Sequence, residues 1–234
     1  MSFIDQLISF DKSVFLSLNG SNSDFIDGIF LSITETTTWI PLFLCMLYVV
    51  IKNNNARRCL ILLGLTVLLV VATDQFSSGL CKPFFHRLRP SHDPSMADLV
   101  DLVNGHRSGL YSFISGHATN TFAIATYFSL IFRNRRTSAV LYLWALISSY
   151  SRIYLGLHYP GDILTGAISG TLIGLLFSYI LKLSVKRFSY QRVNSSALFT
   201  PTGYLRKDLM VVSYAFLLTL IYTVLYGAFY AYIH

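Results

Sequence analysis

Long apolar stretches are the feature that most constrains how this chain can fold. A helix needs about 20 mostly apolar residues to cross the roughly 30 Å hydrocarbon core of a bilayer. Of the 234 residues, 53% are hydrophobic and only 12% are charged, which is too apolar for an ordinary soluble domain. Such stretches occur at residues 36–53, 57–80, 117–133, 137–155, 161–183 and 209–233. The sequence therefore predicts an all-α integral membrane protein, a bundle of six transmembrane helices.

The N-terminal segment has a different pattern. From Phe3 to Leu18, apolar residues recur at helical spacing with charged residues between them, which is typical of a helix lying in the membrane interface. The start of the chain lacks the features of a removable signal peptide, and we expect no soluble domain before the first spanning helix. We predict a single membrane domain over residues 1–234, with residues 1–35 as the interfacial helix and leading segment and residues 81–116 as an outer loop at the active site.

Positive charges predict how the bundle is oriented. Lys and Arg concentrate in the cytoplasmic loops of membrane proteins. Twelve of the 18 Lys and Arg residues fall in three of the predicted connections: Lys52, Arg57, Arg58, Arg133, Arg135, Arg136, Lys182, Lys186, Arg187, Arg192, Arg206 and Lys207. These connections are therefore expected in the cytoplasm and both termini outside. This topology explains the net charge of +7 without a nucleic-acid partner.

The cysteines and several glycines inside the apolar runs predict close packing of the helices. The three cysteines, Cys45, Cys59 and Cys81, lie within or at the ends of apolar runs, which favours packed thiols over a disulfide framework or a zinc site. Three glycines at four-residue spacing, Gly166, Gly170 and Gly174, let a neighbouring helix approach closely. We expect this contact inside the bundle rather than in a dimer.

Three polar clusters lie at the predicted outer helix ends, where charge is costly and usually functional. The first runs from Lys82 to Arg89 and Pro90. An ammonium and a guanidinium together suit a phosphate group, because one supplies a point charge and the other a bidentate fork. The alternative is an interfacial loop whose long side chains reach back toward water.

The second cluster, Ser115-Gly116-His117, stands where a polar loop enters a helix. Free backbone N–H groups at a helix N-terminus, with a glycine that permits close approach, form an anion site. A serine N-cap followed by an interfacial histidine is the alternative.

The third cluster joins Ser151 and Arg152 to His158 and Asp162. Asp162 follows Pro160 at a helix start, where an acidic residue has a purely structural role. A carboxylate beside His158 can also hold the imidazole so that its other nitrogen faces a substrate.

In order, the clusters read Lys, six residues, Arg-Pro; Ser-Gly-His; and Ser-Arg, five residues, His, three residues, Asp. This pattern closely resembles the signature of the type-2 phosphatidic-acid-phosphatase superfamily, whose soluble relatives include vanadium-dependent haloperoxidases. The match runs from Lys82 to Asp162, and the six-helix layout extends it over most of the chain. Ile114 stands where that family usually has proline, which would stiffen the entry to the helix. We expect this change to affect efficiency or substrate preference and not the reaction class.

The resemblance implies a role for each residue. His158 attacks phosphorus to form a phosphohistidine, Asp162 orients its ring, and His117 protonates the leaving oxygen and then activates water. The phosphate oxygens are held by Lys82, Arg89, Arg152, the Ser115 hydroxyl and the Gly116 amide. Positioning and charge stabilisation are the main requirements of phosphoryl transfer, so neither a metal nor a cofactor is implied.

Further residues are expected around this site. Asp74 lies about two helical turns before Lys82 and is predicted to be a supporting partner of Lys82 or Arg152. The loop from Ser91 to Phe113 is long enough to act as a lid and to select the headgroup. Five other residues are predicted to shape the entrance rather than bind a metal: His86, Arg87, His92, His106 and Arg107.

The predicted function is hydrolysis of the terminal phosphate of a membrane lipid on the periplasmic face of a bacterial inner membrane. Candidate substrates are undecaprenyl diphosphate, phosphatidylglycerol phosphate, phosphatidic acid and lipid A phosphates, and no obligatory protein partner is predicted. Transfer of the phosphoryl group to a second lipid is an alternative use of the same site. A transporter or lipid-binding protein is a further alternative, although the sequence lacks the paired broken helices of inverted repeats.

Overall fold

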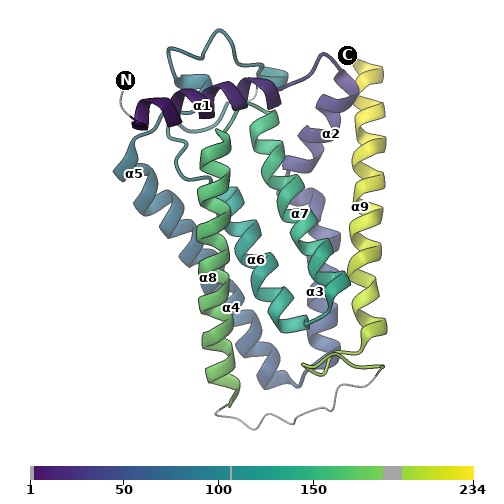
Figure 1. Cartoon of the computed structure of the whole chain (residues 1–234). Coiled ribbons are helices and arrows are strands. Elements are labelled where there is room, and N and C mark those ends of the chain that lie inside the picture. Colours follow the sequence, from purple (N-terminus) through teal and green to yellow (C-terminus); the bar gives the residue numbers. More distant parts are fainter. Residues whose placement is uncertain (1–2, 106, 187–196) are drawn as a thin grey trace.

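The computed structural model describes residues 3–105, 107–186 and 197–234. Arg187, Arg192 and His106 lie outside the described residues. Figure 1 shows a bundle of long helices with one helix lying across its end. The main helices are α1 (Phe3–Leu18), α2 (Asp24–Thr34), α3 (Ile40–Asn53), α4 (Ala56–Asp74), α5 (Lys82–Phe85), α6 (Gly116–Phe132), α7 (Arg135–Tyr154), α8 (Pro160–Lys186) and α9 (Arg206–Ile233).

Among the described residues, four helices are long and apolar enough to cross a membrane. They cover Thr36–Asn53, Ala56–Phe85, Pro160–Val185 and Arg206–Ile233. The chain is thus an all-helical membrane protein. Helices α6 and α7 lie where two further spans were predicted, but α6 has only 17 residues and α7 carries arginines at both ends. The prediction of six crossing helices is therefore borne out for four of them.

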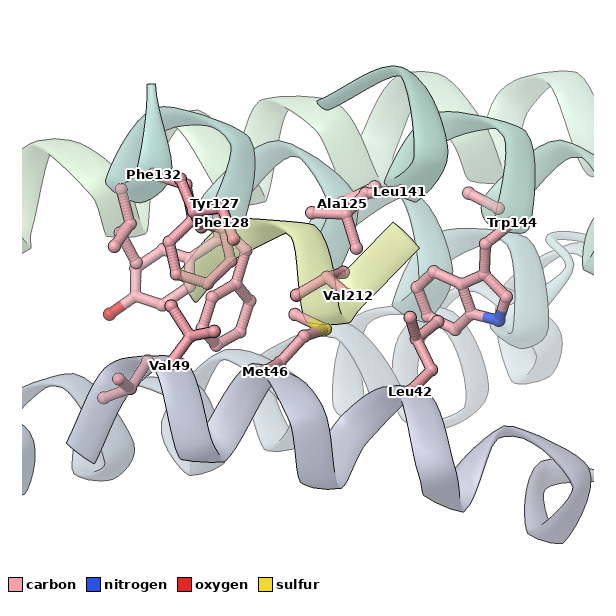
Figure 2. Packing of buried hydrophobic residues seen from close by; sticks show 14 of the residues in the cluster. Leu42, Met46, Val49, Ala125, Tyr127, Phe128, Phe132, Leu141, Trp144 and Val212 are labelled. Carbon is pink, nitrogen blue, oxygen red and sulfur yellow. The ribbon is translucent and has the colours of Figure 1, made fainter. Parts of the chain in front are cut away.

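Helix α6 lies at the centre of the bundle and packs against α4, α7 and α8. Its residues Tyr127, Phe128 and Phe132 join a core with α3, α7 and α9, as Figure 2 shows. From α3, Leu42, Met46 and Val49 point into the same core. A central helix surrounded by other helices needs less apolar character than one facing lipid, which is why α6 can be short and rich in threonine.

The three glycines of α8 form the predicted close contact, and they form it with α6. A Cβ atom on Gly166 would lie 2.7 Å from the carbonyl oxygen of Ser115, and one on Gly170 would lie 2.2 Å from that of Thr119. One on Gly174 would lie 2.7 Å from the Ala123 oxygen. The contact fixes α8 against the N-terminal half of α6, so that the second cluster, at the start of α6, lies beside Asp162 of the third, at the start of α8. All three cysteines are free thiols, as predicted.

The segment after α4 departs from the predicted continuous helix. A π-helical stretch, Gln75–Cys81, widens the helix before α5 begins at Lys82. Such widened turns often occur at functional sites, because they redirect the side chains that follow. The residue that follows this stretch is Lys82, the first residue of the first polar cluster.

Helix α1 lies across the end of the bundle, over the starts of α6 and α8 and the end of α7 (Figure 1). Phe15 is fully buried, and its ring packs edge-on against Tyr159 at 5.4 Å between centroids. Asn19 donates from Nδ2 to the Tyr154 carbonyl oxygen at 2.8 Å and accepts from the Asp101 N–H at 2.8 Å. Phe3 and Phe10 remain exposed. Helix α1 is thus attached to the bundle through one face only.

Candidate active site

The three polar clusters converge at the end of the bundle covered by α1. Lys82 interacts electrostatically with Arg89, Arg152 and Asp162, so the first and third clusters meet. His117, from the second cluster, interacts with Arg152 and His158. Segments up to 80 residues apart in the sequence therefore form one site, as predicted from the order of the motifs.

The His158 ring lies between a carboxylate and a guanidinium. Its Nδ1 lies 3.5 Å from Oδ2 of Asp162, four residues later at the start of α8. Its Nε2 lies 3.2 Å from a terminal nitrogen of Arg89. A guanidinium can only donate, so Nε2 must present its lone pair and the ring proton must sit on Nδ1, facing Asp162. In this tautomer the Nε2 lone pair faces the cationic groups of the site.

Burial keeps this imidazole neutral. His158 is only 2% exposed, and desolvation lowers its pKa to about 4. The Asp162 carboxylate opposes this shift and the guanidinium groups of Arg89 and Arg152 reinforce it. A neutral ring at physiological pH is the form needed for attack on phosphorus.

Two arginines supply buried positive charge beside the ring. Arg89 is 4% exposed and donates to the Leu157 carbonyl oxygen at 2.9 Å. Burial lowers its pKa, while Asp162 raises it. Arg152 donates to the Thr34 hydroxyl at 2.6 Å. Among the described residues, the Nε atoms of both arginines have no hydrogen-bond partner, so each retains a donor for an anion.

Helix α6 presents its N-terminus to the same site. Ser115 is the N-cap, and its hydroxyl accepts from the Ala118 N–H at 3.4 Å. Its own N–H donates to the Asp162 carbonyl oxygen at 3.1 Å, which ties the start of α6 to the start of α8. A Cβ on Gly116 would lie 3.0 Å from the Ser77 hydroxyl, so this position is closely packed. The capping role weighed for Ser115 is confirmed, and its contact with phosphate stays a prediction.

Asp74 is connected to Lys82, one of its two predicted partners. Lys82 donates to the Ser78 hydroxyl at 3.2 Å, and that hydroxyl lies 3.5 Å from Oδ1 of Asp74. The carboxylate also interacts electrostatically with Lys82. Ser78, one turn from each residue, thus bridges the lysine and the acid.

Arg87, which was predicted to shape the entrance, is half-buried and paired with two carboxylates. One terminal nitrogen lies 2.8 Å from Oδ1 of Asp162, which is fully buried. The other lies 2.7 Å from Oδ2 of Asp11, on helix α1. No spacing rule links residues so far apart in the chain, so their charges were the only signal available.

The remaining outer residues are peripheral. His86 and Arg107 are exposed, and His92 interacts with Ser91. Within the described ranges, no group of three His, Cys, Asp or Glu side chains is arranged to hold a metal ion. The loop that follows Ser91 is attached to α1 by an ion pair of 2.6 Å between Lys12 and Asp93.

Comparison with known proteins gives a consistent result. The PAP2 superfamily matches residues 61–186. A lipid A 4'-phosphatase of Bacteroides thetaiotaomicron is 36% identical over 96% of this chain and 98% of its own length. A lipid A 4'-phosphatase of Porphyromonas gingivalis is 36% identical over 73% of this chain and 72% of its own length. The crystal structure of Aquifex aeolicus LpxE superposes with a TM-score of 0.52 at 26% identity, covering 70% of this chain and 92% of that one.

The fold and the site define a class of enzyme, the membrane phosphatases that hydrolyse lipid phosphates. Within that class, the chain belongs to the PAP2 superfamily, whose match covers all three polar clusters.

Proposed function

We propose that the enzyme removes the 4'-phosphate of lipid A through a phosphohistidine formed on His158. The observation that carries the chemistry is the position of the His158 ring, whose Nδ1 faces Asp162 and whose Nε2 faces a cationic pocket. The substrate is suggested by the relatives named lipid A 4'-phosphatase, one of which matches nearly the whole chain. Undecaprenyl diphosphate, phosphatidylglycerol phosphate and phosphatidic acid are the other substrates to compare.

In the first half-reaction, the Nε2 lone pair of His158 attacks phosphorus and the bond to the lipid oxygen breaks. His117 gives that oxygen its proton. In the second half, His117 takes a proton from water, the water oxygen attacks phosphorus, and the bond to Nε2 breaks to release phosphate. Lys82, Arg89 and Arg152 balance the negative charge of the phosphoryl oxygens, with the Ser115 hydroxyl and the Gly116 amide as further donors.

The proposed topology places this site at the outer, periplasmic surface of the inner membrane. Helices α6 and α7 complete six crossings, and α1 lies in the interface with its exposed apolar side chains toward lipid. The chain then forms one membrane domain, and a phosphate carried on acyl chains reaches the helix ends from the bilayer. The proposal includes neither a metal ion nor an obligatory protein partner.

A substrate panel tests the reaction and the substrate together. Purified protein in detergent is given each candidate lipid phosphate at equal mole fraction, and free phosphate and product masses are measured. We expect phosphate release, fastest from lipid A, with the 4' position identified by fragmentation. Fastest release from a prenyl diphosphate would refute the substrate but not the chemistry, whereas phosphate transfer to a second lipid without release would favour a transferase. No reaction with any lipid would refute both.

Cysteine labelling tests the topology. Leu99, in the loop beside the site, is 61% exposed, and Lys207 is exposed at the opposite end of the bundle. In intact cells, a reagent that cannot cross the inner membrane should label Leu99→Cys and not Lys207→Cys. The reverse pattern would place the site in the cytoplasm.

A further inference from the structure

Helix α1 contacts the candidate active site through residues other than those that define the three motifs. What we infer from these contacts rests on the proposed function. We propose that α1 is a working part of the active site: Asp11 positions Arg87, and Arg87 holds Asp162 in place behind His158. Neither Asp11 nor Arg87 belongs to the motifs, and Asp11 lies outside the residues that match the PAP2 superfamily.

The first link is the guanidinium of Arg87, which bridges two carboxylates. Its two terminal nitrogens lie 2.8 Å from Asp162 and 2.7 Å from Asp11, and its plane stacks over the Tyr159 ring at 4.1 Å from the centroid. Burial lowers the pKa of Arg87, but the carboxylates of Asp162 and Asp11 outweigh burial and raise it overall. A planar fork can bridge two acids in this way, and a lysine ammonium lacks that geometry.

The second link is Asp162, whose two oxygens have separate partners. Oδ1 accepts from Arg87, while Oδ2 accepts from the Tyr159 N–H at 2.9 Å and faces Nδ1 of His158. Because Arg87 binds Oδ1, Oδ2 is the oxygen that faces the imidazole. The charge of Arg87 also offsets part of the negative potential that Asp162 exerts on the ring.

The third link is Asp11, which joins α1 to the start of α8. Its Oδ1 accepts from the Gly161 N–H at 2.8 Å, and its Oδ2 accepts from Arg87. A Cβ on Gly161 would lie 2.8 Å from that same Oδ2, so a larger residue there would displace the carboxylate. The Asp11 side chain is 15% exposed. A well-shielded carboxylate with both oxygens occupied fixes Arg87 more firmly than a solvated surface pair would.

The test compares variants of this chain of contacts with a control on the same helix. Asp11→Ala should lower kcat about 10-fold and Arg87→Gln about 100-fold, each with little change in KM, because partners that support a reacting group act on the chemical step. Asp11→Asn keeps one acceptor oxygen, which can serve either Arg87 or the Gly161 N–H but not both, and should recover part of the loss. Lys12→Ala breaks the neighbouring ion pair with Asp93, which contacts neither Arg87 nor Asp162, and should leave kcat within about 2-fold.

The pH dependence of kcat/KM shows whether Arg87 positions Asp162 behind His158 or only attaches α1 to the bundle. The charged and titratable groups around His158 are Asp162, Arg89, Arg152 and His117, with Arg87 behind Asp162. Removing the Arg87 charge leaves Asp162 uncompensated, which favours the imidazolium. The acid limb of kcat/KM should therefore move to higher pH in Arg87→Gln and stay in place in Lys12→Ala.

A double-mutant cycle keeps the inference testable if the alanine variant is poorly folded. Asp11→Asn and Arg87→Lys should be non-additive in kcat if they act through one contact, whereas Lys12→Ala and Arg87→Lys should be additive. Wild-type kcat and acid limb in Asp11→Ala, or additivity of the first pair, would overturn the inference while leaving the proposed function intact. Full activity in His158→Ala would instead overturn the proposed function.

Discussion

The two ends of the bundle carry the same kinds of charged residue in different surroundings. At the end covered by α1, Arg89 is 4% exposed, lies beside the His158 imidazole and interacts with the buried Asp162 carboxylate. At the opposite end, Arg133 and Lys182 are exposed, and with Arg58 they line an open cavity of about 820 Å³ between α4, α6 and α8. Lys52 there pairs with Asp208 at 2.8 Å while its own side chain remains 47% exposed.

The difference shows that burial, and not charge count, distinguishes the candidate active site from the opposite end of the bundle. Exposed cations are solvated, and their interactions are weakened by water and salt. Buried cations with an unused donor have lost that solvation and recover it only by binding an anion. Substitution of one arginine at each end of the bundle tests this difference.

Arg152→Lys should lower kcat/KM about 100-fold, which corresponds to about 2.7 kcal/mol of transition-state stabilisation, because the charge is kept and the planar fork is lost. Arg133→Lys, at the opposite end, is the matched control and should be within about 2-fold of wild type. Initial rates of phosphate release measure both. Equal rates for the two variants would remove the functional distinction between the ends.

Asp74→Ala should have a smaller effect, about 5-fold to 10-fold in kcat/KM, because its hydrogen-bonded link to Lys82 passes through the Ser78 hydroxyl. Asp74→Asn keeps an acceptor for that hydroxyl and should recover much of the loss. Asp74→Ala with wild-type rates at every lipid concentration would show that the acid does not support Lys82.

The pKa of His158 provides a further comparison between a buried and an exposed group. Its pKa in the folded protein is lowered to about 4, whereas an unfolded histidine titrates near 6.5. Between these values the unfolded state binds the extra proton, so His158 makes stability fall as the pH is lowered from about 6.5 toward 4. In NMR spectra of ring-labelled protein, assigned with His158→Asn, this ring should remain neutral at pH 5. The exposed His86 ring is the internal comparison, and a His158 signal that titrates at or above 6.5 would contradict a desolvated imidazole.

Removal of metal ions should have no effect, because Lys82, Arg89 and Arg152 supply the positive charge that metal ions provide in other phosphatases. Activity after dialysis against a chelator should equal that of the untreated enzyme. Vanadate, which adopts the five-coordinate shape of the transition state, should inhibit competitively in the same preparation. Activity that is lost with the chelator and restored by a divalent ion would show that the buried cations are insufficient.

Much of this molecule can be predicted from its sequence, and the limits have physical reasons. The apolar runs locate the helices because a membrane requires long apolar segments. The motif residues were identified because their order and spacing resemble the signature of a known phosphatase superfamily, and the structure brings Lys82, His117 and His158 into one electrostatic cluster. The end of α2, at Glu35, also falls directly before the first predicted apolar run, residues 36–53.

The partners of Arg87 could not be predicted in this way. Its contacts with Asp11 and Asp162 join residues 76 and 75 positions apart, and neither helical periodicity nor a local motif encodes such a pairing. The widened helix at Gln75–Cys81 was also missed, because the sequence was predicted to form one continuous helix over residues 57–80. Both features depend on how separate helices meet, which the local sequence does not determine.

Trapping the covalent intermediate tests the central claim most directly. Enzyme mixed with a lipid substrate labelled at its terminal phosphate is quenched in base, where a phosphohistidine persists, and the digested peptides are examined by mass spectrometry. The account predicts label on the peptide that contains His158, lost on treatment with acid and absent from His158→Ala, which should turn over at least about 10⁴-fold more slowly than wild type. Label on any other residue, or wild-type turnover by His158→Ala, would contradict it.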